Sequence, residues 1–478
     1  MRAALVHAAV LAGLAACCTG CTPSPASVPA VATDGLVVVQ SPPGVARAQP
    51  ERFDLDARYP LGSRVIVVRP GRGPAEERFV LSRGFASAGA PAVSPDGSTV
   101  LFAGLRTPES PWAIYETRSR GSRPRKLLEL NRDCGDPAYL AGDRVVIACA
   151  AEGEPHWSLY TVFADGTGIE RITFGVDSAF DPHPLRDGRI LFSMQQGPGV
   201  GRPDRSAALF TINPDGSMFE PFSGSHTAPA SRSRARETSD GGVLFIATDP
   251  DGAARLRRVE LSRPLATEQT LSFMLDRVVS AEPLAGDALL LTGRPASDTD
   301  SVPTSAVFWT VPGSSDLQPV FDDPEWDDVE AVSLSPTTAP RGKPSGLRSD
   351  QRSGRLIVYD ANRSDGVVGP PRGGSRPVSL TLQTISSGKP RTLGNLPIEE
   401  DGSLFVEVPA DRPIRVRTLD ASGAEISTSE WFWVRGGETR ACFGCHESRE
   451  SAPVNRVVRS IGRKPLSLQP TTHGVTAR

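Results

Sequence analysis

Short runs of Val, Ile, Leu and Phe recur along the chain, and many of them follow a turn that contains Gly and Asp. Between about residues 64 and 325, five such turns carry an aspartate, at Asp96, Asp143, Asp187, Asp240 and Asp287. The intervals between these aspartates are 47, 44, 53 and 47 residues. A period this constant predicts a repeat architecture.

A second signal lies between these turns. Asp165-Gly166 and Asp215-Gly216 each separate two runs rich in β-formers, which is typical of a hairpin. Two hairpins in each period give four antiparallel strands, and four strands repeated around an axis make a propeller blade. We count five periods and expect a sixth blade to close from residues 64–68 together with residues 355–359; seven blades are the alternative.

The period changes in the last third of the chain. Residues 378–385, 404–408 and 414–419 alternate between apolar and polar positions, with turns between them. Several short strands of this kind predict a small β-sandwich. We therefore expect an all-β fold with a propeller over 51–335, then a closing strand and sandwich over 336–440.

The N-terminus has the pattern of an export signal. Arg2 precedes an apolar stretch at 3–16, which is too short to span a membrane. The stretch ends at Cys17 in a sequence that resembles a bacterial lipobox, so 1–17 is expected to be a lipoprotein signal peptide with Cys17 as the lipidated residue. An ordinary secretory signal is the alternative. Residues 18–50 are predicted to be a flexible tether, although 36–40 could instead form a first edge strand.

Composition and charge limit the partners and the location that the sequence predicts. The formal net charge is -3 and 38% of residues are hydrophobic, so neither nucleic-acid binding nor general disorder is indicated. No later apolar run reaches spanning length, so membrane contact is expected through the lipid alone. The expected location is the periplasmic side of the bacterial cell envelope, with the outer membrane favoured.

The candidate chemistry lies in Cys442-Phe443-Gly444-Cys445-His446. Two cysteines three positions apart can form thioethers with the two vinyl groups of a porphyrin, and the adjacent histidine can then bind the iron. We expect one covalent haem c, held by Cys442 and Cys445 with His446 as proximal ligand, in a segment over 441–478. The alternatives are a structural zinc site, for which no second ligand pair follows at knuckle spacing, and a chance pair of cysteines.

Two further features of the sequence each have two interpretations. Cys134 and Cys149 lie in one repeat and could form a disulfide in an oxidising compartment, or could be two buried thiols. Trp431 and Trp433 share one face of a strand that leads into the haem motif, so they could contact the macrocycle or belong to the sandwich core.

The turn motifs resemble those of TolB-type propellers with PD40 repeats. In those proteins a strand pair around a sequence such as Ser94-Pro95-Asp96-Gly97 alternates with a pair around Ala164-Asp165-Gly166. The resemblance covers roughly 64–325 and implies a propeller.

Residues 396–448, from LPIEEDGSLFVEVPADRPIRVRTLD through to CFGCHES, resemble the middle domain of the hydrazine synthase alpha subunit family. Members of that family combine a propeller with a haem motif near its C-terminal end. Their catalytic haem is ligated by a tyrosine a few residues after the motif, whereas the last tyrosine here is Tyr359. The resemblance therefore implies a related haem protein in which hydrazine synthesis itself is not expected.

The function expected from these features is that of a monohaem cytochrome that transfers electrons or binds a small molecule at the haem. Its redox partner or ligand is not identified by the sequence, and a haem-dependent oxidoreductase activity is left open. The alternative is a non-catalytic binding or scaffold propeller of the envelope, with a structural haem or none.

Overall fold

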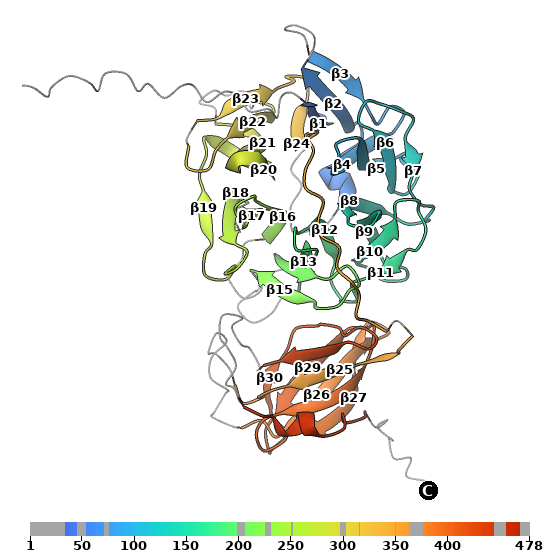
Figure 1. Ribbon diagram of the computed structural model, residues 1–478, viewed down its shortest axis with the longest axis vertical. Coiled ribbons are helices and arrows are strands. Elements are labelled where there is room, and N and C mark those ends of the chain that lie inside the picture. The colour runs from blue at the N-terminus through green and yellow to red at the C-terminus, as the bar shows by residue number, and fades with distance from the viewer. Residues whose placement is uncertain are drawn as a thin grey trace, which may run out of the picture.

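The chain folds into six blades around an axis, with a small β-sandwich attached at one side (Figure 1). The computed structural model describes residues 34–44, 54–70, 76–197, 206–224, 231–249, 252–296, 303–314, 316–348, 350–363, 376–443 and 456–468. Each blade is a four-stranded antiparallel sheet whose first strand lies at the axis. The predicted all-β propeller with a sandwich is therefore confirmed, and the number of blades is six.

The strands follow one another blade by blade. The first blade contains β24 (Asp327–Ser333), β1 (Leu36–Ser41), β2 (Arg64–Pro70) and β3 (Glu76–Val80). The second contains β4 (Ser87–Val93), β5 (Thr99–Leu105), β6 (Ala113–Arg118) and β7 (Arg125–Lys126), and the third β8 (Cys134–Leu140), β9 (Arg144–Ala150), β10 (Trp157–Phe163) and β11 (Glu170–Arg171). The fourth contains β12 (Ala179–Pro184), β13 (Ile190–Gln196), β14 (Ser206–Ile212) and β15 (Glu220–Ser223). The fifth contains β16 (Ser231–Glu237), β17 (Gly242–Thr248), β18 (Ala254–Glu260) and β19 (Gln269–Leu271), and the sixth β20 (Leu275–Pro283), the 3₁₀ turn η1 (Ala285–Asp287), β21 (Leu289–Pro295), β22 (Ala306–Thr310) and β23 (Gln318–Phe321).

The propeller closes differently from the prediction. β24 pairs antiparallel with β1, with Val37 opposite Val332 and Val38 opposite Ala331. Of the two interpretations of 36–40, the strand is confirmed and the tether is wrong; the strand is buried and pairs on both sides, so it does not lie at an edge. The predicted closing strand at 355–359 was wrong, because β25 (Ser353–Val358) pairs with strands of the sandwich instead.

The inner strands of four blades share a bulge that turns one residue toward the axis. Ala90, Asp136, Asp181 and Arg234 have φ angles of 50°, 46°, 50° and 54°, and each lies at a register shift between its inner strand and the next strand. A bulge of this kind re-aims a side chain and breaks the regular alternation of faces. Three of the four bulge residues, Asp136, Asp181 and Arg234, thereby direct polar side chains toward the propeller axis.

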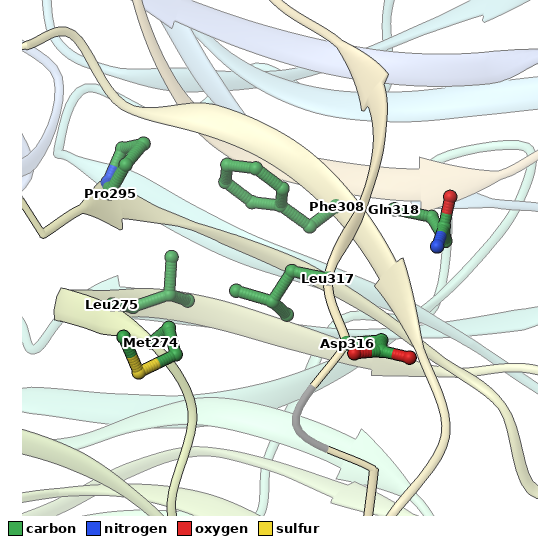
Figure 2. A pocket seen from close by; sticks show the side chains of 7 residues that line it. All are labelled: Met274, Leu275, Pro295, Phe308, Asp316, Leu317 and Gln318. Atoms are coloured by element: carbon green, nitrogen blue, oxygen red, sulfur yellow. The ribbon is translucent and has the colours of Figure 1, made fainter.

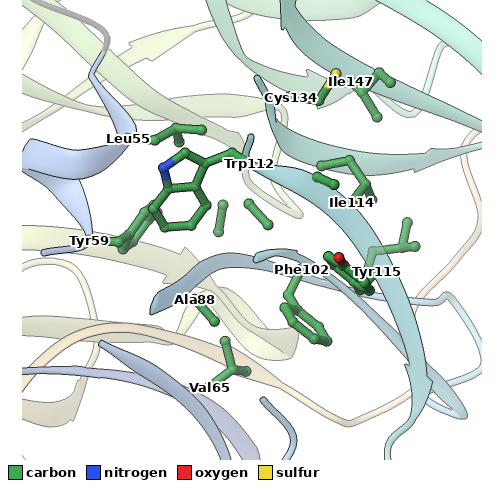
Figure 3. Close-up of a cluster of buried hydrophobic side chains, with 14 of the residues drawn as sticks. Leu55, Tyr59, Val65, Ala88, Phe102, Trp112, Ile114, Tyr115, Cys134 and Ile147 are labelled. Atoms are coloured by element: carbon green, nitrogen blue, oxygen red, sulfur yellow. The ribbon is translucent and has the colours of Figure 1, made fainter. Parts of the chain in front are cut away.

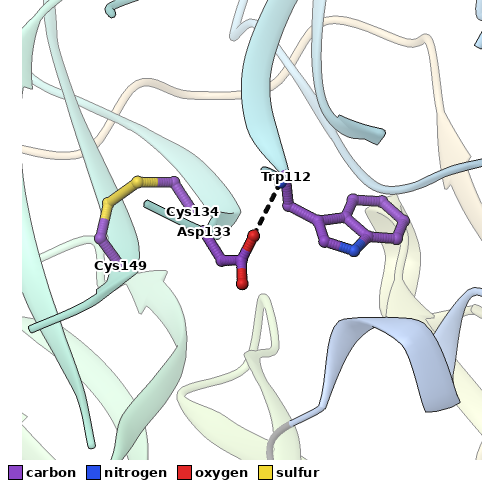
Figure 4. Close-up of a disulfide and its surroundings, with 4 residues drawn as sticks. All are labelled: Trp112, Asp133, Cys134 and Cys149. Atoms are coloured by element: carbon purple, nitrogen blue, oxygen red, sulfur yellow. Dashed lines mark hydrogen bonds between the residues drawn. A yellow bond between two sulfur atoms is a disulfide. The ribbon is translucent and has the colours of Figure 1, made fainter. Parts of the chain in front are cut away.

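The largest apolar cluster joins the first three blades (Figure 3). It includes Tyr59 and Trp112, whose ring centroids lie 6.2 Å apart, and Leu55 from the one-turn helix α2 (Leu55–Arg58). Cys134 and Cys149 face each other across β8 and β9 and are joined by a disulfide in this core (Figure 4).

The sandwich consists of a three-stranded and a four-stranded sheet. The first has the order β28 (Leu404–Pro409), β25, β31 (Thr439–Cys442), and the second β27 (Lys389–Pro397), β26 (Ser379–Ser386), β29 (Ile414–Leu419), β30 (Glu425–Thr428). A 3₁₀ turn, η3 (Arg459–Gly462), lies beyond them. Alternating apolar residues of both sheets, such as Leu356, Leu380 and Val406, form one core. Within the described part of the chain, no helix is both long enough and apolar enough to cross a membrane.

Candidate functional site

The predicted haem motif begins at the last residue of an edge strand. β31 pairs in parallel with β25 alone, and Cys442 lies opposite Val358. The Cys442 side chain is half-buried and packs against the apolar core of the sandwich. Cys445 and His446, the other two residues of the motif, lie outside the described residues, as does the predicted lipidation residue Cys17.

An aromatic pair stands beside this cysteine. Tyr359 donates its backbone N–H to the carbonyl of Cys442 over 2.8 Å, which fixes the two chain segments together. The rings of Tyr359 and Phe443 have centroids 5.2 Å apart and are tilted by 49°, and Phe443 is 37% exposed. Tyr359 precedes the motif by more than eighty residues in the chain, so its proximity is visible only in the structure.

The chain returns to the same place after the motif. The Arg456 guanidinium donates to the carbonyls of Tyr359 and Asp401, each over 2.8 Å, and lies 3.2 Å from a carboxylate oxygen of Asp360. Farther on, Ser460 donates its N–H to Ser403 Oγ. Both flanks of the segment that carries Cys445 and His446 are therefore attached at the end of β25.

The strand predicted through Trp431 and Trp433 is not formed, since in this stretch only Phe432 makes a bridge, to Ile414. The irregular segment before β31 is anchored on the propeller. Trp433 is fully buried and stacks on Phe219 of the fourth blade with ring centroids 4.0 Å apart, and its Nε1 donates to the carbonyl of Gly216. Trp433 thus contacts the propeller, an alternative that the sequence did not suggest. Trp431 instead contacts Arg415, whose guanidinium carbon lies 4.7 Å from the centroid of the Trp431 ring.

Arg435 completes this anchor. Its guanidinium lies 2.8 Å from Glu170 in the third blade and 2.8 Å from Asp411 in the sandwich, and it donates to the carbonyls of Arg171 and Asp215. Only 5% of its side chain is exposed. The haem-motif strand is therefore held by a buried cation that contacts both parts of the molecule.

The two propeller histidines that the structure describes have hydrogen-bond or charged partners within the propeller. His183 is half-buried, and its Nε2 accepts the backbone N–H of Glu237 over 3.1 Å. Burial, with help from Arg236, lowers the pKa of His183 to about 3, so it is neutral at physiological pH. Burial also lowers the pKa of His156, whose Nε2 lies 3.1 Å from Glu154. Among the described residues, no group of three or more His, Cys, Asp or Glu side chains is placed to hold a metal ion.

A charge cluster at the propeller axis was not predicted. Arg58 of α2 donates to both carboxylate oxygens of Asp136 at 3.0 Å, and its guanidinium lies 3.2 Å from Asp181 and 3.6 Å from Glu330. Burial raises the pKa of Asp136 to about 6, against the opposing effect of Arg58. One sequence feature could have indicated this cluster. An Asp-Pro pair occurs at the same place in two inner strands, at Asp136-Pro137 and Asp181-Pro182.

A hollow with both apolar and polar lining residues lies on the sixth blade. It has a volume of about 370 Å³ and is lined by Met274, Leu275, Pro295, Phe308, Asp316, Leu317 and Gln318 (Figure 2). Met274 is 70% exposed at its rim.

Comparison with known proteins finds sequence and structural similarity to the alpha subunit of hydrazine synthase. Residues 352–447 match the family described as hydrazine synthase alpha subunit middle domain. The chain is 23% identical to hydrazine synthase subunit alpha of Kuenenia stuttgartiensis over 81% of its own length and 63% of that protein. The solved structure of Kuenenia stuttgartiensis hydrazine synthase matches with a TM-score of 0.78 and 20% identity, over 90% of this chain and 71% of that one. TolB from Acinetobacter baumannii matches with a TM-score of 0.42 and 13% identity, over 58% of this chain and 61% of that chain. The resemblance to the hydrazine synthase alpha family is confirmed, and the chain spans 63% of the length of its curated relative.

Proposed function

We propose that this protein is an exported, lipid-anchored monohaem c-type cytochrome that transfers electrons or binds a small molecule at its haem. The observation that carries the proposal is the CFGCH motif at 442–446. Cys442 and Cys445 would hold the porphyrin through thioethers, and the His446 imidazole would bind the iron. The haem would supply an iron centre that exchanges one electron.

The described part of the site fits this group. Cys442 ends a strand that, among the described residues, pairs with β25 alone, so a bulky substituent on its sulfur need not disrupt that pairing. The adjacent Phe443 and Tyr359 rings offer an apolar wall of the kind against which a porphyrin packs. Attachment of both flanks at Tyr359 would limit the reorganisation that accompanies a change of iron charge.

The propeller would act as the platform of this centre. Its connection to the sandwich runs from β24 across turns of the second and fourth blades (Figure 1). Thr337 donates its N–H to the carbonyl of Pro95, Arg341 to that of Arg186, and the Ser345 hydroxyl to Asp215. The Trp433 and Arg435 anchor then fixes the sandwich on the fourth blade, so a partner docked on the propeller would meet the motif in a defined position.

The reaction of the relative is not carried over to this chain. A shared scaffold does not transfer chemistry, which depends on the residues around the iron. The only tyrosine near the motif in the described structure is Tyr359, which comes before the motif in the chain, whereas the family resemblance implies a tyrosine ligand after it.

The test is a visible spectrum of the protein expressed with the c-type maturation machinery, before and after reduction by dithionite, followed by haem staining of a denaturing gel. The expected result is a sharp α-band on reduction and a stain that survives denaturation. The variant Cys442→Ser with Cys445→Ser should lose both signals. The variant Cys18→Ser with Cys21→Ser removes the other cysteine pair of the same spacing, which Thr22 follows, and should keep both.

Carbon monoxide separates the two modes of action. A reduced spectrum that does not change with the gas indicates two strong axial ligands and therefore electron transfer. A shifted spectrum indicates an exchangeable site for a small molecule. Absence of covalent haem would contradict the proposal and leave a scaffold propeller.

A further inference from the structure

The short segment 54–59 is inserted at the propeller axis, although it belongs to no blade. Asp54 caps α2, accepting the N–H groups of Asp56 and Ala57 at 3.0 and 3.2 Å. Asp56 in turn accepts Trp112 Nε1 at 2.8 Å. The single turn is thus fixed by the blades, since four residues alone would not stay helical in water.

Two inner strands have glycines where this segment docks. A Cβ on Gly89 would overlap the ring of Tyr59, and a Cβ on Gly135 would lie 2.9 Å from two methyl carbons of Leu55. Each glycine comes directly before the bulge residue of its strand, Ala90 or Asp136. The second and third blades are therefore shaped to receive Leu55 and Tyr59 (Figure 3).

Three blades direct carboxylates at the Arg58 guanidinium. Asp136 and Asp181 come from the bulges of the third and fourth blades, and Glu330 comes from β24 of the first. Their side chains are only 5%, 7% and 11% exposed, and that of Arg58 is 11% exposed. The two terminal nitrogens of Arg58 divide these carboxylates: Nη1 contacts both oxygens of Asp136, and Nη2 contacts Asp181 and Glu330. A planar guanidinium presents two such nitrogens, whereas an ammonium presents one.

The other cations of the axis come from the blades themselves. Arg234 lies 2.6 Å from Glu330, and Arg236 lies 3.3 Å from Glu282. Arg58 is different, because it enters from a segment outside the sheets, and it borders a cavity of about 50 Å³ that these same groups line. Three carboxylates are thus arranged around a cation from outside the blades, and only Glu330 of the three also has an ion pair with a blade arginine among the described contacts.

We propose that the end of the propeller axis is a guanidinium-binding site, and that α2 is an internal ligand that keeps it closed. When α2 withdraws, the site takes the arginine side chain of another polypeptide, with its two terminal nitrogens divided among the same carboxylates. The carboxylates of Asp136, Asp181 and Glu330 bind its charge, and Gly89 admits an aromatic neighbour. This inference does not depend on the haem.

The test empties the site and refills it. In Arg58→Ala, methylguanidinium chloride should raise the melting temperature by about 2 °C, while the wild type, whose site is filled, should not respond. Methylammonium chloride at the same concentration controls for charge and ionic strength. Adding Asp136→Asn to Arg58→Ala should abolish the rise. Equal responses of wild type and Arg58→Ala, or a rise that survives Asp136→Asn, would overturn the proposal.

A second variant serves if Arg58→Ala does not fold. Asp56→Asn weakens the contact with Trp112 and leaves the guanidinium site intact. Methylguanidinium should then compete with Arg58 and speed the amide hydrogen exchange of residues 54–59 several-fold in this variant, with no change under methylammonium. Exchange that is the same with both salts would contradict an exchangeable ligand and leave Arg58 as a structural contact only.

Discussion

Arg58 and Arg435 both anchor a segment on the propeller, but they do so in opposite surroundings. The carboxylates that face Arg58 are almost fully buried, whereas Glu170 and Asp411, which face Arg435, are 44% and 41% exposed. Arg435 also contacts backbone carbonyls and lies 5.0 Å from the ring centroid of Phe174. The first site is held mainly by charges that have lost their water, and the second by a mixture of packing, hydrogen bonds and hydrated charge.

The difference determines what a mutation should cost. Removing one partner from a buried ion pair leaves uncompensated charge in a medium that solvates it poorly. Carboxylates that water can reach recover much of that loss. Removing the cation at the propeller axis, Arg58, should therefore cost more stability than removing Arg435 between propeller and sandwich. At that second place, losing Arg435 should cost less than losing the aromatic contact of Trp433.

The largest effect is expected from Arg58→Met, which keeps the apolar stem and removes the charge. Three buried carboxylates would lose their common partner, and we expect a loss of about 3–5 kcal/mol in the free energy of unfolding measured by urea denaturation. Arg459→Met is the matched control, because Arg459 and Glu400 are 56% and 83% exposed; it should change stability by less than about 0.5 kcal/mol. Equal losses in the two variants would remove the basis of the comparison.

Trp433→Ala should come next, with a loss of about 3 kcal/mol. It deletes the stack on Phe219 and the hydrogen bond to the carbonyl of Gly216, and it leaves a cavity between propeller and sandwich. Hydrogen exchange should accelerate at residues 216–219 and 433–440 and stay unchanged in the second blade. Acceleration spread evenly over the propeller would argue against a local anchor.

Arg435→Met is expected to be milder than either, with a loss of about 1–2 kcal/mol. Its partners Glu170 and Asp411 can turn to water, and only the two carbonyls lose a buried donor. A urea titration side by side with Arg58→Met gives the ratio directly. A loss as large as that of Arg58→Met would show that burial of the arginine itself, and not of its partners, sets the cost.

The smallest effect is a dependence on pH at Asp328, a carboxyl that contacts no arginine among the described residues. Asp328 accepts Gln40 Nε2 at 3.0 Å and the N–H of Asp323 at 3.2 Å, where the propeller closes. Burial raises its pKa to about 7, so between pH 4 and 7 the folded state holds a proton that the unfolded state has released. This contribution is complete below pH 4 and is lost as the pH rises through 7.

The free energy of unfolding of Asp328→Asn, relative to that of the wild type, should therefore be higher at pH 8 than at pH 5. Urea titrations at the two pH values give the difference. A gap between the two proteins that does not change with pH would contradict the assigned shift.

The sequence predicted the repeats because each blade carries its own local signal, a Gly-Asp turn followed by a β-rich run. It did not predict which strand closes the ring. Residues 327–333 contain three acidic side chains and are less apolar than 355–359, yet they form the closing strand, because the choice depends on a partner, β1, about three hundred residues earlier. The role of Trp433 was missed for the same reason, since its contact is with a blade far away in the chain.

Arg58 was missed for another reason. Asp54 to Tyr59 form one helical turn with no period, beside a stretch that is polar and rich in Pro and Ala. What places them is the set of glycines and bulges in distant strands. At the proposed haem site, by contrast, the chemistry could be predicted, because the spacing of Cys442, Cys445 and His446 is itself what haem attachment requires. Only the aromatic neighbour Tyr359 could not be predicted without the structure.

The measurement that tests the central proposal most directly is the intact mass of the mature protein, purified from cells that attach haem to exported proteins. A covalent cytochrome should show the mass of the processed chain plus one haem, and the increment should disappear in the variant Cys442→Ser with Cys445→Ser. A processed wild-type chain without that increment would contradict the assignment of the motif.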